Sequence, residues 1–392
     1  MRLGFLNPLF ERPGPWATVY VDTSHPDQSA AEEHERSARE ACRRLEQQGA
    51  DPRTCRAVYD ELTAVTPATE PVGRAVFASH GEVVLDPPLT APPQGAPHAC
   101  WSALPHVGPL MGLAGDDPSC LVAYIDRTGA DFELRGARGD RPVGQVAGQR
   151  WPVHRTATAD PSERHFQLRT ENTWEHNAGL IADELRARQE ETRADLVLLV
   201  GDARERRAVH DRLPEQLRER AAETAHGGRA PGSASPGTHA ARLLDRDVDE
   251  VRARHLHDRT EEAMERFRAG RVPMEGRVTA AEGVPALVDA AREHRIGTLL
   301  IRPDGTDLYR DVWAGAEPDQ VAMRRTDLQY LGDAHPAAAR ADDALIRSAA
   351  ATGAEVLTVP PGGDAEDTND APVGGLGALL RWPYEGGGGA TR

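Results

Sequence analysis

The polar segment from residue 148 to residue 169 carries the side chains of this chain that are best suited to chemistry or RNA contact. It is rich in arginine and histidine and has only scattered apolar residues. Guanidinium groups bind phosphates through paired hydrogen bonds, and both side-chain types stack on unpaired bases. A solvated loop whose arginines pair with Asp160 and Glu163 is the alternative interpretation. The expected RNA-binding residues are Arg150, His154, Arg155, Arg164, His165 and Arg169.

Two regular elements must hold this segment at its ends. Before it, the apolar run 121–125 and the alternating run around Phe132 and Leu134 are joined by the turn 126–129, which predicts a β-hairpin. After it, a helical pattern runs from about Gln167 to Arg193. A loop that is tethered to rigid elements at both ends can present its side chains to a partner.

The length of 392 residues predicts two to three domains. No run approaches the roughly 20 apolar residues that a membrane-spanning helix needs. The N-terminal residues have one early arginine and neither a sustained apolar core nor a small-residue cleavage pattern. We therefore expect no signal peptide, no membrane partner and a cytoplasmic location.

The net charge and the cysteine spacing argue against two further classes of protein, nucleic-acid coat proteins and proteins held by disulfides or metal ions. A net charge of −16 argues against a general nucleic-acid coat protein, because phosphate attraction dominates nonspecific binding. It leaves room for RNA contact by a local set of arginines. The four cysteines are widely spaced, with no paired histidines nearby, so neither a disulfide framework nor a metal site is expected, and no cofactor is predicted. They are Cys42, Cys55, Cys100 and Cys120.

Helical and strand patterns alternate along the rest of the chain, which predicts an α/β fold. In the first third, a strand at 16–23 precedes helices at 29–48 and 52–65 and two short strands, with no phosphate-binding loop or catalytic cluster. In the middle third, Asp202 and His210 follow the buried strand 196–200. We interpret them as a helix N-cap and a surface histidine, not as an acid/base pair. In the last third, residues 303–339 are expected to be an irregular acidic stretch.

Four stretches together resemble the bacterial branch of the archaeo-eukaryotic release factor superfamily, to which Pelota and the ribosome-hibernation factor Balon belong. They are PGPWATVYVDT, YIDRTGADFELRG, ADLVLLVGDARERRAVHDRLPEQL and a closing helix–strand–helix–strand pattern that ends in GGLGALLRWPY. The last stretch is the most specific, since family members close their third domain with a similar glycine-rich strand. The glycines expected to have this structural role are Gly374, Gly375 and Gly377.

The resemblance implies three α/β domains. Residues 1–113 would form an N-terminal α/β domain, residues 114–270 a middle domain of RNase H-like fold, and residues 271–392 a C-terminal domain like the ribosomal protein L7Ae. It also implies a cytoplasmic factor, expected to be monomeric, whose partner is the ribosome through rRNA and tRNA, together with a translational GTPase.

The catalytic device of the family is a Gly-Gly-Gln tip on the loop between the hairpin and the long helix. There the glutamine orients the water that attacks the peptidyl-tRNA ester. In this chain the tip falls near residues 160–162, and no Gly-Gly-Gln occurs anywhere. We therefore expect a noncatalytic ribosome-binding factor of the hibernation or rescue type, whose middle domain enters the A site towards the peptidyl-transferase centre.

Two alternatives stay open. One is a peptidyl-tRNA hydrolase or release factor that positions water with Gln167 or Ser162. The other is a stress-linked interaction protein whose target is not the ribosome.

Overall fold

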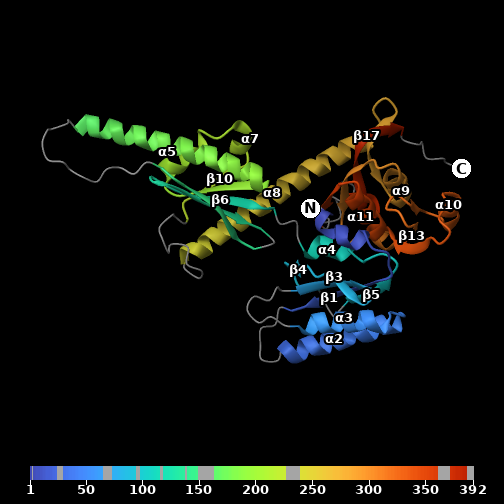
Figure 1. The fold of residues 1–392 in the computed structure, drawn as a ribbon. Helices are drawn as coiled ribbons and strands as arrows, with labels where there is room; N and C mark the ends of the chain where they lie inside the picture. Colours follow the sequence, from blue (N-terminus) through green and yellow to red (C-terminus); the bar gives the residue numbers. More distant parts are fainter. Residues whose placement is uncertain are drawn as a thin grey trace. The chain divides into compact units, whose positions relative to one another are not determined.

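The computed structural model describes the chain except for residues 2, 24–29, 65–72, 94–97, 115–117, 137–138, 149–162, 227–238, 361–370 and 386–392. The chain divides into two compact units. One combines both ends of the chain, Met1–Asp116 and Arg259–Arg392, and the other is Asp117–Asp258. Both consist of β-sheets covered by helices, which confirms the predicted α/β class (Figure 1). The division into three domains at 113/114 and 270/271 stays a prediction.

The unit Asp117–Asp258, here called the middle unit, is built on a sheet with the strand order β10-β9-β6-β7-β8. β6 and β7 pair antiparallel from Cys120↔Arg135 to Asp126↔Gly129, so the predicted hairpin is confirmed. β9 runs parallel to β6, and β10 runs parallel to β9. The strands are β6 (Cys120–Asp126), β7 (Gly129–Arg135), β8 (Arg141–Ala147), β9 (Leu196–Val200) and β10 (Ala221–Thr224).

Helices cover both faces of this sheet because its central strands are apolar on both sides (Figure 1). On one face, Ile181 and Leu185 of α5 share a buried cluster with Leu121. On the other face, Leu244 of α8 is buried with Val122. Successive residues of β6 thus serve opposite cores. The helices are α5 (Glu163–Thr192), α6 (Ala203–His210), α7 (Glu215–Arg218) and α8 (His239–Arg271).

The N-terminal part of the other unit contains a sheet with the order β3-β2-β1-β5, and a short β4 also pairs with β2. Two helices cover one face, and Asp51 caps the second by accepting hydrogen bonds from the backbone N–H groups of Arg53 and Thr54. The elements are η1 (Leu3–Leu6), α1 (Asn7–Phe10), β1 (Trp16–Asp22), α2 (Ala30–Gln47), α3 (Pro52–Thr63), β2 (Gly73–Ser79), β3 (Glu82–Leu85), β4 (Pro88–Leu89), β5 (His98–Ser102) and α4 (Gly108–Leu113).

The C-terminal part of the same unit contains a sheet with the order β11-β17-β12-β16 and a small sheet with the order β14-β13-β15. The long last strand β17 pairs antiparallel with both β11 and β12. The elements are β11 (Arg277–Glu282), α9 (Val284–Arg292), β12 (Ile296–Ile301), η2 (Thr306–Tyr309), β13 (Asp311–Ala314), β14 (Val321–Ala322), α10 (Arg325–Tyr330), β15 (Ala337–Arg340), α11 (Ala341–Ala351), β16 (Glu355–Thr358), η3 (Val373–Gly375) and β17 (Leu376–Glu385).

The prediction that residues 303–339 are irregular is wrong. They form η2, α10 and the small sheet of β13, β14 and β15. These strands have two to four residues each, so they are too short to produce a period of two that a sequence pattern could reveal.

The two ends of the chain share one hydrophobic core. Leu6, Trp16 and Tyr20 from the N-terminal part belong to the same buried cluster as Leu299 and Leu345 from the C-terminal part. The backbone of residue 1 also pairs with Val356 of β16, whose N–H donates to the carbonyl oxygen of residue 1 at 3.0 Å. The unit is therefore held together by residues that lie more than 250 positions apart in sequence.

The glycines before and in β17 lie where a side chain would not fit. Gly374 and Gly375 have φ angles of 69° and 87°. A Cβ on Gly374 would lie 2.8 Å from the Cβ of Asp307, and one on Gly377 would lie 2.8 Å from Cε2 of Phe267. Substitution at any of the three would strain the backbone or displace a neighbour. Among the described residues, no helix combines the length and the apolar character that crossing a membrane would take.

Candidate functional site

The start of the arginine-rich loop, at Gly148, is hydrogen-bonded to the turn of the β6–β7 hairpin. The backbone N–H of Gly148, one residue after β8, donates to the carbonyl oxygen of Thr128 at 2.7 Å. The side-chain amide Nδ2 of Asn177 on α5 donates to the carbonyl oxygen of Arg127 at 3.0 Å. Gly148, where the loop leaves β8, and Asn177, about four turns after the start of α5, are thus hydrogen-bonded to the same turn, which fixes the start of the loop and the body of α5 against the hairpin.

No motif or spacing in the sequence indicates the structural role of Asn177. It is 1% exposed, and it lies directly against the root of the loop. A Cβ on Gly148 would lie 2.6 Å from Nδ2 of Asn177 and closer still to its Cγ. The close approach of Gly148 therefore depends on the absence of a side chain at that position.

We expect Gly148→Ala to displace Asn177 and to weaken both hydrogen bonds to the hairpin turn. The cost to the free energy of unfolding should be about 1–3 kcal/mol, as for other overpacked sites. Gly179→Ala is the matched control, because Gly179 lies on α5, the helix that carries Asn177, and nothing lies within 4 Å of the added Cβ. Urea denaturation of both variants measures the difference, and equal stabilities would contradict the proposed close packing.

The structure locates part of the predicted site. Helix α5 begins at Glu163, four residues before the expected start at Gln167. Arg164, His165, Gln167 and Arg169 therefore belong to its first two turns, and their side chains lie outside the description. Residues 149–162, with Arg150, His154, Arg155 and Ser162, lie outside the described residues.

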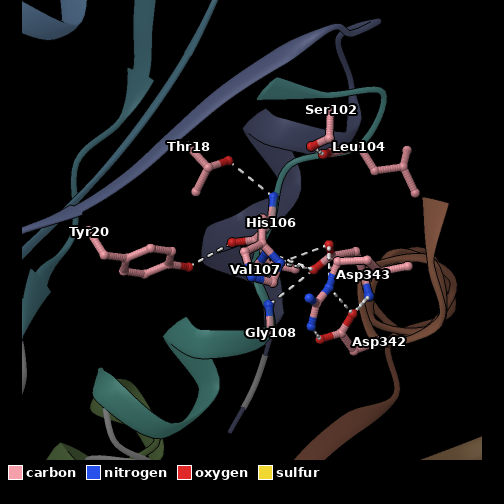
Figure 2. A network of polar contacts seen from close by, with 10 residues as sticks. Thr18, Tyr20, Ser102, Leu104, His106, Val107, Gly108, Asp342 and Asp343 are labelled. Atoms are coloured by element: carbon pink, nitrogen blue, oxygen red, sulfur yellow. Dashed lines mark hydrogen bonds and ion pairs between the residues drawn. The ribbon is translucent and has the colours of Figure 1, made fainter. Parts of the chain in front are cut away.

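A second polar cluster, which the sequence did not suggest, is buried in the unit of the chain ends (Figure 2). The Oδ1 atom of Asp343 accepts hydrogen bonds from the backbone N–H groups of Val107 and Gly108, at 2.9 and 3.1 Å. Its Oδ2 atom lies 2.9 Å from Nδ1 of His106. Asp343 on α11 thus satisfies the donors at the start of α4.

Tyr20 and Thr18 hold the other side of His106. The Tyr20 hydroxyl donates to the carbonyl oxygen of His106 at 2.7 Å, and the N–H of His106 donates to the Thr18 hydroxyl at 3.1 Å. Burial, and secondarily the charge of Asp343, raises the pKa of Tyr20 well above its usual range, so this hydroxyl remains a donor. The cluster connects β1, the segment before α4 and α11.

His106, Asp342 and Asp343 form the one group in the described part of the chain whose histidine and carboxylate atoms, within 4.8 Å of one another, could hold a metal ion. Its atoms are already engaged. Arg340 binds the Asp342 carboxylate through Nε at 3.0 Å and Nη2 at 2.7 Å, and its positive charge would oppose a cation there. We conclude that the contacts of this cluster join β1, the segment before α4 and α11.

Asp342 should make the stability of this unit depend on pH. Burial, and next the neighbouring charge of Asp343, raises the pKa of Asp342 from 3.8 to about 6. Between these values the folded protein binds more protons than the unfolded chain, so this contribution to stability is present at low pH and is lost as the pH rises through 6. Asp342→Asn is neutral throughout. The free energy of unfolding of the natural protein, minus that of the variant, should therefore fall by about 2 kcal/mol from pH 4 to pH 7. Exposed Asp289→Asn should show a flat difference in the same urea titration.

Gly108 is the position where this cluster leaves no room for a side chain. A Cβ there would lie 3.0 Å from Cγ of Asp342 and closer to its Oδ2. Gly108→Ala should lower the free energy of unfolding by about 2 kcal/mol or more, because the carboxylate is fixed by Arg340. Gly112→Ala, on the same helix, meets only Pro303 at 3.9 Å and should be neutral or stabilising by less than about 1 kcal/mol. Equal melting temperatures of the two variants would refute this packing.

A protein family with a known sequence model matches the middle unit. Residues 119–272 match the sequence model of bacterial archaeo-eukaryotic release factor family 2. The chain is also similar to the uncharacterised protein Rv2629 of Mycobacterium tuberculosis, with 29% identity over 386 residues that cover 97% of each chain.

Two solved structures resemble the chain. One is ribosome-bound archaeal Pelota with ABCE1, at 14% identity and a TM-score of 0.41, covering 96% of this chain and 93% of that chain. The other is Archaeoglobus fulgidus Pelota, at 14% identity and a TM-score of 0.33, covering 80% of each chain. The match to the family model covers residues 119–272, which contain the hairpin, the loop and α5. This region of the chain is therefore similar to the bacterial archaeo-eukaryotic release factors.

Proposed function

We propose that the protein is a translation factor that binds the ribosome without hydrolysing peptidyl-tRNA, and that it acts in hibernation or rescue. The observation that carries the proposal is that residues 119–272 match a release factor family while the loop between β8 and α5 lacks Gly-Gly-Gln. In this proposal the middle unit enters the A site, and its loop points towards the peptidyl-transferase centre. The ribosome is the main partner, and a translational GTPase is a second one.

The composition of the loop supports binding over hydrolysis. A water-orienting group typically contributes 10²-fold or more to the rate, and the two glycines that would allow close backbone approach are missing from residues 149–162. The predicted tip has Pro161 instead, which has no N–H and a fixed φ angle. The four arginines supply phosphate contacts that need no chemistry at the ester.

The start of α5 weakens the case for a hydrolase. Gln167 would have to stand at the loop tip to position water, but α5 begins at Glu163 and therefore includes Gln167 in its second turn. Ser162 immediately precedes the helix, where a serine more often serves as a cap. A noncatalytic factor needs neither residue near the ester.

Two experiments test the proposal. Cosedimentation with 70S ribosomes at moderate salt should move the protein into the ribosomal fraction, and its absence there would refute ribosome binding. Release of a labelled peptide from loaded ribosomes should stay at the background rate. Release that disappears in Gln167→Ala, but persists in the nearby surface variant Glu175→Ala, would instead establish a hydrolase.

A further inference from the structure

The middle unit contains a cavity of about 570 Å³ beside the edge strand of its sheet. One wall consists of residues 219–226, which include the whole of β10, and the other is a single stripe of α8. The stripe runs through Asp247, Glu250, Arg254 and Asp258, which recur every three or four residues and so share one side of the helix. At 1.5 Å per residue it is about 16 Å long, enough for an extended segment of about five residues. We call this cavity the β10 groove.

The backbone of β10 is available on the side that faces the groove. β10 is the last strand in the order β10-β9-β6-β7-β8, so no strand in the described part of the chain pairs with its outer side. The N–H of Val197 on β9 donates to the carbonyl oxygen of Arg220 at 3.2 Å. In a parallel ladder alternate residues bond the same neighbour, so the backbone groups of Ala221 and Glu223 point away from β9. Such a row of donors and acceptors can pair with another strand.

The floor of the groove is apolar and its rim is acidic. Leu196, Leu198 and Val251 line the floor. Five carboxylates and two guanidinium groups line the walls, so the groove is negative when its histidines are neutral. One guanidinium, that of Arg254, pairs with Glu250 at 2.7 Å, and Asp247 lies 2.8 Å from Nδ1 of His226 at one end.

We propose that the β10 groove binds an extended, arginine- or lysine-rich segment of a partner protein, which adds a strand to the outer side of β10. Backbone pairing with Ala221 and Glu223 would give affinity. Apolar side chains of the segment would pack against the half-buried Val251, and its basic side chains would face the acidic rim. The same negative charge disfavours RNA, whose phosphates would meet these carboxylates. The inference does not depend on ribosome binding by the arginine-rich loop, since it concerns another surface of the middle unit.

The test uses the full chain and a fluorescent dodecapeptide of alternating arginine and valine. We expect saturable binding by fluorescence anisotropy at moderate salt, and no binding of the glutamate–valine peptide of the same length. A third peptide, N-methylated at every residue, keeps every charge but has no backbone N–H left to donate on either edge. It should bind about tenfold more weakly or not at all. Equal binding of the methylated peptide would overturn strand addition.

Two neighbouring charge reversals on α8 provide the matched control. Glu250 lines the groove, whereas Asp249 points elsewhere because adjacent helix residues lie on different sides. Glu250→Arg should weaken peptide binding by about tenfold, and Asp249→Arg should change it by less than about twofold. Equal losses in both variants would show only nonspecific charge attraction, and displacement of the peptide by a dodecameric RNA would show a nucleic-acid surface. Either result overturns the proposal, and neither bears on cosedimentation with ribosomes.

Discussion

Replacing the four arginines of the loop segment by alanine should lower the affinity of the protein for 70S ribosomes by about 10²- to 10³-fold at moderate salt. The changes are Arg150→Ala, Arg155→Ala, Arg164→Ala and Arg169→Ala. Each arginine is expected to neutralise a phosphate and release a counterion. The slope of log affinity against log salt concentration should therefore become shallower by about 3. Filter binding or cosedimentation over a salt series measures both quantities.

The matched control removes four arginines from α2, where each pairs with a glutamate of the same helix. These are Arg36, Arg39, Arg43 and Arg44. The change in net charge is the same in both quadruple variants, so a general electrostatic effect would weaken both equally. If the α2 variant loses as much affinity as the loop variant, the arginine-rich loop is not the RNA-binding site. If neither loses affinity, RNA contact by these arginines is excluded.

Asp343→Ala should cost about 3–5 kcal/mol of the free energy of unfolding of the unit formed by the chain ends. The carboxylate is 4% exposed as a side chain, and its removal leaves the backbone donors of Val107 and Gly108 and the ring of His106 without their buried acceptor. Leaving buried donors unsatisfied is far more costly than losing an exposed charge. Urea denaturation followed by tryptophan fluorescence is a suitable measurement, because Trp16 is buried in this unit.

Asp289→Ala on α9 is the control for this prediction, since its side chain is 66% exposed. It should change the free energy of unfolding by less than about 0.5 kcal/mol. If Asp343→Ala were no more destabilising than Asp289→Ala, the buried cluster would contribute nothing to the junction between the two ends of the chain.

Features with a strong local pattern could be predicted from the sequence. The hairpin of β6 and β7 was evident because apolar runs surround a turn that contains Gly129. Strand β9 was evident from its five consecutive apolar residues. The helical pattern predicts the long helix α5, but the helix begins four residues before the predicted start, because the sequence before Gln167 has few apolar residues to set a helical period.

Features that depend on distant contacts could not be predicted. His106 and Asp343 are 237 residues apart, and neither belongs to a motif that would suggest the other. Asp342 and Asp343 lie in the first turn of α11, where acidic residues are common, so their position suggests no further role. Likewise, nothing next to Gly148 in the sequence indicates that Asn177 lies against it. Such contacts arise from topology, and a single sequence contains no period or spacing that encodes them.

The discontinuous unit has a consequence for synthesis of the chain. Trp16 and Tyr20 emerge from the ribosome first, but Leu345 and Leu376, which complete their buried cluster, emerge more than 300 residues later. At a synthesis rate of about 5–20 residues per second, the apolar face of the N-terminal sheet stays exposed for tens of seconds before the C-terminal residues that pack against it are made. The middle unit, which is continuous from Asp117 to Asp258, can fold during that interval. The N-terminal segment of the nascent chain should therefore need a chaperone, and slower translation should increase aggregation of the protein.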